Sequence, residues 1–343
     1  MPCLQSKMGT QTVRLVLVAL TAGLAVGWST APSSAERKVA GREVPSLSLV
    51  PDSVAFWDAR RGLATSGVCD PGKPCAGGAV LGTGDGGRTF RVVLRTARSA
   101  ERVVTIGAAG AIVWLDDGRA FLTVDGGRSW RHYRSQIAAH PNASLASWTS
   151  AIDTRAVPDT SATDTKLVVL TTDDGGARWV RRRAPCPRAL SDRVLIDLAS
   201  PSRAWLVCLG QGGAGEMGKA VYRTADGGRS WQLVAETSFA PRVLRGGISI
   251  GGYPAGIAVT GAGFGLLWET RGTLYVTRDG GSDWAANTRV AEPEVDFGLA
   301  ATALPDGHAY FLVAHDGTIR QVRLLATSDY GRSWRIVRAW PAT

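Results

Sequence analysis

The sequence predicts an all-β protein built from six repeated units. A segment of the form Thr-x-Asp-x-Gly-x-x-Trp, with Phe replacing Trp once, recurs six times in 343 residues, and its Asp residues are 40 to 53 positions apart. The 42 Gly and 12 Trp residues suit a chain of many turns separated by bulky flat side chains. No segment has the sustained 3.6-residue apolar period of a helix bundle. A unit of about 50 residues has the size of a four-stranded propeller blade. We therefore expect a six-bladed β-propeller, or a seven-bladed one if one unit has lost its segment.

Residues 1–35 have the pattern of a secretory signal. Lys7 and Arg14 precede an apolar run from Leu15 to Trp28, and the small residues Ser33-Ser34-Ala35 follow it. The run has 14 residues, fewer than the roughly 20 that span a bilayer as a helix. We expect a cleaved leader at 1–35 and a single propeller domain at 36–343, secreted or held in the cell envelope. An uncleaved membrane anchor is the alternative.

The six repeated segments, called boxes below, are predicted to be hairpin turns. Strand-like residues precede and follow them, as in Ala79-Val-Leu before the first box and Arg91-Val-Val-Leu after it. The Asp carboxylate and the Thr hydroxyl can close such a turn by hydrogen bonds to its own backbone. Gly adopts backbone angles that other residues reach only with strain, and the aromatic side chain can fill the space beside the next unit. The boxes span 83–90, 123–130, 172–179, 224–231, 277–284 and 327–334.

This pattern resembles the Asp-box (BNR) repeat of sialidases, sortilin-type receptors and photosystem II assembly-factor propellers. In those families the box lies on the turn between the third and fourth strands of a blade, at the rim and away from the ligand site. The resemblance covers essentially all of 36–343 and implies structural rather than catalytic roles for its residues. These are Asp85, Phe90, Asp125, Trp130, Asp174, Trp179, Asp226, Trp231, Asp279, Trp284, Asp329 and Trp334.

Strand order assigns the remaining loops to two faces of the propeller. If each box joins strands three and four, it shares a face with the turn between strands one and two. The opposite face then carries the longest irregular segments, at 66–75, 153–165 and 209–218. Loops on that face converge on the central channel, where propellers usually bind ligands.

Four cysteines remain after the leader, an even number that predicts two disulfides in an exported protein. Cys69 and Cys75 share one loop, while Cys186 and Cys208 are both expected at the loop-bearing face. We infer the pairs Cys69–Cys75 and Cys186–Cys208, although spacing alone excludes neither alternative pairing. The chain has four His and no CxxC pair, so we expect no metal site.

The densest charge cluster is Arg181-Arg182-Arg183, followed by Arg188. Without the leader the chain keeps an excess of about eight positive charges, almost all from Arg. The Arg guanidinium can bind carboxylate, phosphate or sulfate with two parallel hydrogen bonds. The cluster is therefore a candidate binding site for an acidic protein or for an anionic envelope polymer or glycan, with no nucleic acid expected. A solvated strand end is the alternative interpretation.

Two function classes fit these observations. A sialidase-like exo-glycoside hydrolase needs three Arg around a carboxylate, a Tyr activated by a Glu and an acid. Sialidases carry a Phe/Tyr-Arg-Ile-Pro motif, which is matched here only by the imperfect Arg42-Glu43-Val44-Pro45, and no Tyr/Glu pair stands out among six Tyr. A non-catalytic binding, scaffolding or assembly propeller fits better. We expect it to be a monomer without a cofactor and to meet a membrane only through an uncleaved leader.

Overall fold

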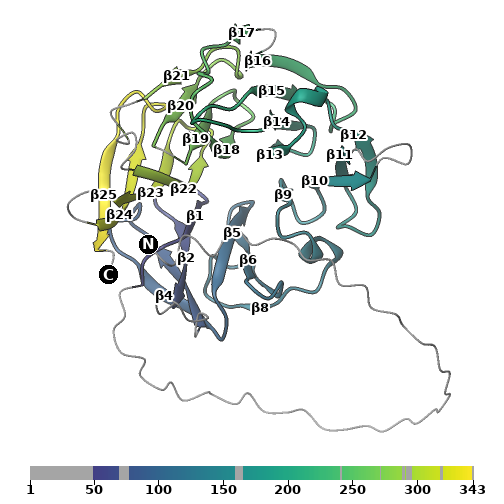
Figure 1. Ribbon diagram of the computed structural model, residues 1–343. Helices are drawn as coiled ribbons and strands as arrows, with labels where there is room; N and C mark the ends of the chain where they lie inside the picture. The colour runs from purple at the N-terminus through teal and green to yellow at the C-terminus, as the bar shows by residue number, and fades with distance from the viewer. Residues whose placement is uncertain are drawn as a thin grey trace, which may run out of the picture.

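The computed structural model describes residues 49–68, 77–158, 165–239, 242–270, 272–287, 290, 296–316 and 320–341. Within them, 25 strands form six antiparallel sheets arranged as a ring (Figure 1). The protein is a six-bladed β-propeller, as predicted, and the seven-bladed alternative is wrong. The leader predicted at 1–35, Cys69 and Cys75 lie outside the described residues. No helix in the described part of the chain is long and apolar enough to cross a membrane.

Each blade consists of consecutive strands that pair in chain order, starting from the strand beside the channel. Blade 1 contains β1 (Ser53–Phe56), β2 (Gly62–Val68), β3 (Gly77–Thr83) and β4 (Arg91–Thr96). Blade 2 contains β5 (Ala100–Ile106), β6 (Gly110–Leu115), β7 (Ala120–Thr123) and β8 (Arg131–His132). Blade 3 contains β9 (Ser144–Leu145), β10 (Ala151–Pro158), β11 (Thr165–Thr172) and β12 (Val180–Arg183).

The second half of the ring repeats this plan with one addition. Blade 4 contains β13 (Arg193–Ser200), β14 (Arg203–Leu209), β15 (Lys219–Thr224), β16 (Gln232–Phe239) and a fifth strand, β17 (Arg242–Arg245). Blade 5 contains β18 (Pro254–Val259), β19 (Gly265–Glu269), β20 (Leu274–Thr277) and β21 (Ala285–Ala286). Blade 6 contains β22 (Asp296–Ala303), β23 (Ala309–Asp316), β24 (Arg320–Thr327) and β25 (Arg335–Pro341). Two 3-10 helices, η1 (Gln136–Ala139) and η2 (Arg188–Leu190), precede blades 3 and 4.

Every box connects the third and fourth strands of its blade. In all six, the backbone N–H of the residue after the box Asp donates to the turn between the first two strands, as Gly86 does to the carbonyl of Arg60 at 2.8 Å. The equivalent bonds join Gly126 to Ala109, Gly175 to Thr149, Gly227 to Ser202, Gly280 to Gly263 and Tyr330 to Gly307. The boxes and these turns therefore share one end of the propeller, called the box face, and the connection at 210–218 of blade 4 lies on the opposite end, called the loop face. The segments 66–75 and 153–165, predicted to be irregular, are partly strand: 66–68 belong to β2, 153–158 to β10 and Thr165 to β11, and their other residues lie outside the described part of the chain.

The hydrophobic core is divided among the six boundaries between blades. Trp205 and Val207 of blade 4 pack with Leu267 and Tyr275 of blade 5, for example, in a cluster that also contains the box residue Trp284. The other boundaries repeat this arrangement, so each box aromatic packs against the preceding blade rather than the next unit. The box turn itself lies against the preceding blade, since a Cβ at Gly87 would meet Leu324 of blade 6 and one at Gly281 would meet Trp205 of blade 4.

Candidate functional site

The carboxylates of the box aspartates are hydrogen-bonded within the turns that they close. In blade 4, Asp226 Oδ1 accepts hydrogen bonds from Thr224 Oγ1 (2.8 Å) and from the N–H of Ser230 (2.9 Å). Ser230 Oγ donates to its second oxygen at 2.6 Å. Hydrogen bonds to the charged form lower a carboxyl pKa, and the Ser230 hydroxyl bond is the main cause of the lowered pKa of Asp226. These carboxylates remain ionised and internally bonded, which suits a turn and not a general acid.

The sixth box shows how strongly this turn is specified. Tyr330 replaces the first of the two glycines and still adopts a left-handed φ of 59°, close to the 71–79° of the equivalent glycines in the other five boxes. Its ring packs edge-on against Phe264 of blade 5, with centroids 5.5 Å apart. Packing thus offsets a backbone conformation that is unfavourable for a bulky residue.

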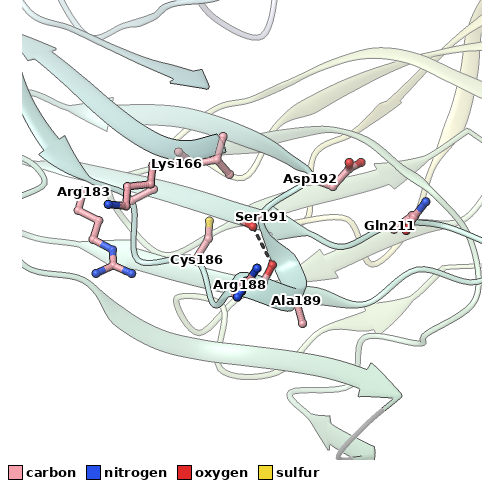
Figure 2. Close-up of a pocket in the computed structure, with 10 residues that line it drawn as sticks. Lys166, Arg183, Cys186, Arg188, Ala189, Ser191, Asp192 and Gln211 are labelled. Carbon is pink, nitrogen blue, oxygen red and sulfur yellow. Dashed lines mark hydrogen bonds between the residues drawn. The ribbon is translucent and has the colours of Figure 1, made fainter. Parts of the chain in front are cut away.

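A groove of about 510 Å³ on the loop face brings two of the four predicted arginines together with Lys166 and with Cys186 of the disulfide. It lies where blade 3 meets blade 4. Figure 2 shows Lys166 and Arg183 at one end, Arg188 and Cys186 in the middle, and Asp192 and Gln211 at the other end. Ser191 Oγ donates to the carbonyl of Arg188 at 2.7 Å and so closes η2. This groove, called the cationic groove, contains three cationic side chains and one carboxylate.

The predicted arginine cluster divides in the structure. Arg183 and Arg188 line the cationic groove, whereas Arg181 and Arg182 do not. Arg182 points to the other side of β12, where its guanidinium donates to Thr171 Oγ1 at 2.7 Å. Arg181 is exposed and lies closer to the box face, opposite Leu170 of β11. Alternation along a strand separates Arg182 from Arg183, whereas Arg181 shares the side of Arg183 but lies two residues nearer the box face.

A disulfide holds the wall of the cationic groove. Cys186 in the connection between blades 3 and 4 bonds Cys208 at the end of β14, which confirms this predicted pair. Cys208 is buried in the core cluster of the blade 3–blade 4 boundary. The bond therefore anchors the segment that carries Arg183 and Arg188 to the rigid second strand of blade 4.

A second polar cluster lies on the inner strands, and sequence patterns gave no signal for it. Asp197 of β13 accepts from Ser144 Oγ of blade 3 at 2.7 Å and from the N–H of Val259 of blade 5 at 2.9 Å. Burial raises the pKa of Asp197 despite these bonds. Arg102 of blade 2 donates to the carbonyls of Pro141 and Ala143. The cluster ties blades 2 to 5 together round the channel, because its groups satisfy one another across blade boundaries.

Two histidine–aspartate pairs are also nearly buried. One lies near this cluster, and the other lies in blade 6 on the far side of the ring. His140 Nδ1 lies 2.7 Å from Asp153 Oδ2, and the His140 ring stacks on Trp179 with centroids 4.2 Å apart. His315 Nδ1 lies 2.7 Å from Asp296 Oδ1 in blade 6. All four side chains are nearly buried. Both pairs are buried links between neighbouring segments of the chain.

Three buried tyrosines lack the environment of an activated nucleophile. Burial raises the pKa of Tyr275 and of Tyr310 to about 12, and it also raises the pKa of Tyr222. Glu269 beside Tyr275 adds to the rise because two negative charges repel. Instead of activating a Tyr, Glu269 forms a buried ion pair with Lys219, with Nζ and Oε1 3.2 Å apart. The raised pKa makes the phenols of Tyr222, Tyr275 and Tyr310 harder to ionise, which is the reverse of activation as a nucleophile.

Comparison with known proteins supports the fold and limits what can be said of function. No protein-family model matches the chain. The photosystem II assembly lipoprotein Ycf48 of Synechococcus sp. (strain CC9902) is 28% identical over 157 residues, which make up 43% of this chain and 42% of that protein. The chain thus matches about two fifths of the length of this curated relative.

Solved structures extend the similarity over most of the chain. The α-L-arabinanase of Penicillium chrysogenum has a TM-score of 0.51 at 13% identity, covering 84% of this chain and 95% of the enzyme. The GH93 α-L-arabinofuranosidase of Fusarium graminearum has a TM-score of 0.50 at 11% identity, covering 82% of this chain and 96% of the enzyme. The chain shares their propeller fold. At such low identity the likeness does not extend to their activity.

Proposed function

We propose that this protein is a non-catalytic propeller that works outside the cytoplasm and binds an acidic segment of a protein partner in the cationic groove. The groove is the observation that carries the proposal. Its cations come from blade 3 and from the connection to blade 4, and a disulfide holds part of its wall. The disulfide holds the backbone between Arg183 and Arg188, which lowers the entropy cost of ordering this segment when a carboxylate binds.

Three further observations support an extracytoplasmic binding role. A disulfide is typical of oxidising compartments, and the predicted leader directs the chain there. The partial similarity to an assembly lipoprotein favours a protein as the partner. The carboxylates of Asp153 on β10 and Asp197 on β13 are engaged by His140 and Ser144, so they are poorly placed to act on a substrate.

A labelled poly-glutamate peptide is the direct probe of this proposal. We expect the protein to bind it and the affinity to fall as ionic strength rises above about 0.1 M, since exposed charges are then screened within about 10 Å. Arg183→Glu should weaken binding at least about tenfold, because it removes a charge-assisted hydrogen-bond donor and introduces repulsion. Fluorescence anisotropy measures both effects.

Arg181→Glu is the matched control, since Arg181 lies on the same strand but outside the groove. It changes the net charge by the same amount and should alter the affinity less than about threefold, as expected for a screened rim charge. Equal losses in the two variants would show attraction by net charge alone and would contradict the proposed site. Release of sugar from a sialoside or an arabinan by the purified protein would favour the hydrolase alternative.

A further inference from the structure

The box face carries an uneven ring of arginines. Blades 6, 1 and 2 each have one Arg three residues after the box Asp and a second directly after the box aromatic. Blade 5 has Ser282 and Ala285 at these positions, blade 3 has Ala177 and Val180, and blade 4 has only the first. Blades 6, 1 and 2 thus contribute six arginines at these positions, and all six are exposed: Arg88, Arg91, Arg128, Arg131, Arg332 and Arg335. They form what we call the basic arc.

The arc is continuous across the three blades, which are neighbours in the ring (Figure 1). Arg338 of blade 6 donates to the carbonyl of Arg88 in blade 1 at 2.8 Å. Arg335 and Arg88 both lower the pKa of Tyr310, against the larger effect of burial, so their charges lie round the same boundary. On the other side of blade 1, Arg91 and Arg128 line one groove of about 480 Å³ with Arg61.

Several guanidinium groups of the arc make no bonds within the protein. In the described part of the chain, the side chains of Arg91, Arg128, Arg131 and Arg335 have no hydrogen bond or ion pair. The matching groove between blades 4 and 5 differs. There Arg203 donates to the carbonyl of Gly261 at 2.9 Å, and Arg223 donates to that of Gly280 at 3.2 Å. The donors of the basic arc therefore remain available for an external anion.

The nearby carboxylates do not neutralise these groups directly. Asp85, Asp125 and Asp329 each bond the hydroxyl and backbone of their own box. Asp58 is paired with Arg61 at 2.7 Å, and Asp306, an exposed acid near Tyr310 in blade 6, lies 3.1 Å from His308 Nδ1. These aspartates lie within turns, whereas the unbonded arginines are exposed at the rim. Positive charge therefore dominates the solvent side of the arc.

Aliphatic side chains are exposed beside these arginines. Val124 in the box of blade 2 is 56% exposed, and Ile336, next to Arg335 on β25, is 57% exposed. Val92, next to Arg91 on β4, is 37% exposed. Three of the six large hydrophobic residues that are exposed in the described chain thus lie in the blades of the arc. Cationic side chains mixed with exposed aliphatic ones are typical of surfaces that rest on a membrane interface.

We propose that the basic arc docks the box face onto an anionic phospholipid bilayer. Arginines bind the headgroup phosphates, and Val92, Val124 and Ile336 insert at the level of the glycerol backbone. A soluble anionic polymer would use the arginines and leave the aliphatic residues without a role. Docking through the box face directs the loop face, with its cationic groove, away from the membrane.

Sedimentation with vesicles of phosphatidylglycerol and phosphatidylcholine in equal amounts tests this inference. We expect the full chain to bind these vesicles and not to bind vesicles of pure phosphatidylcholine. A triple variant, Arg91→Gln, Arg131→Gln and Arg335→Gln, should bind about a hundredfold more weakly, since each Arg near an anionic surface contributes about fivefold in affinity. None of these residues lies in a box turn, and an unchanged melting temperature verifies that the variant is folded.

The control triple variant, Arg178→Gln, Arg181→Gln and Arg229→Gln, removes the same charge from blades 3 and 4. It should retain vesicle binding within about fivefold. Ile336→Ser should weaken binding to vesicles but leave binding to soluble polyphosphate unchanged. Equal losses in the two triple variants would overturn the arc. Unchanged vesicle binding of Ile336→Ser would overturn the membrane as its partner in favour of a soluble polyanion.

Discussion

The box aspartates show how one residue type can specify a turn and also make stability depend on pH. Hydrogen bonds from Thr89 are the main cause that lowers the pKa of Asp85 to about 2, below its ordinary value. A carboxyl group whose pKa is depressed by folding stabilises the native state above its unfolded pKa, near 3.9. That stabilisation disappears as the pH falls toward the folded value.

Asp85→Asn therefore has a predictable pH signature. The variant should melt at a lower temperature than the parent at pH 6, and the difference should shrink steadily between about pH 4 and pH 2. Thermal unfolding followed by circular dichroism across this range measures the difference. A gap that stays constant with pH would mean that the charge of Asp85 contributes nothing to the turn.

At the same scale, the sequence could identify the box residues but not which of the neighbouring arginines form a site. The boxes are local, and their Thr, Asp and Gly interact within a few residues. The use of Arg183 and Arg188 depends instead on which side of β12 each residue faces and on where η2 begins. Such details follow from tertiary packing.

Among structural elements, the blade boundaries differ in how deeply they bury the box aromatic. Trp284 is 2% exposed, and its Nε1 donates to the carbonyl of Gly281 at 3.0 Å. Trp231 is only half-buried, and its Nε1 has no partner. We predict that Trp284→Ala costs about 3 to 5 kcal/mol in the free energy of unfolding, as for other buried aromatic residues. Trp231→Ala should cost clearly less. Urea denaturation of both variants tests this order, and the reverse order would contradict the boundary packing.

The disulfide between Cys186 and Cys208 should stabilise the element that forms the cationic groove. It closes a loop with a sequence separation of 22 residues, for which chain entropy predicts about 3 kcal/mol. The double variant Cys186→Ala, Cys208→Ala should lose about this much stability and should bind poly-glutamate more weakly. Calorimetry and anisotropy measure the two effects, and unchanged affinity would show that the groove does not depend on the bond.

The extra strand of blade 4 could not be predicted from the repeats. β16 is the fourth strand of blade 4, and its residues Glu236–Phe239 also pair with a fifth strand, β17 (Arg242–Arg245). No box or turn motif marks this segment. Its pairing depends on an exposed sheet edge that exists only once the blade has formed.

For the molecule as a whole, the described strands close the ring through side chains. Each sheet of the described chain contains only consecutive strands, so blades 6 and 1 meet face to face. Tyr310 stacks on Phe56 with centroids 3.5 Å apart, and its hydroxyl donates to the carbonyl of Ala59 at 2.7 Å. The number and order of blades could be predicted from regular box spacing, whereas this closure depends on residues far apart in sequence.

Tyr310→Phe should keep the stacked ring and cost about 1 kcal/mol, the usual net contribution of one hydrogen bond. Tyr310→Ala should cost several times more and should speed hydrogen exchange in β1 and β22 before the other inner strands. Mass spectrometry of exchanging peptides detects this difference. Uniform exchange round the ring would contradict closure at this boundary.

Hydrogen exchange also provides the most direct test of the central claim, that the cationic groove binds an acidic protein segment. With poly-glutamate bound, the account predicts slower exchange in 183–192 and 209–218, and no change in the boxes or the inner strands. The protection should disappear in Arg183→Glu and persist in Arg181→Glu. Protection confined to the channel or spread over the box face, with none in 183–192, would contradict the proposed function.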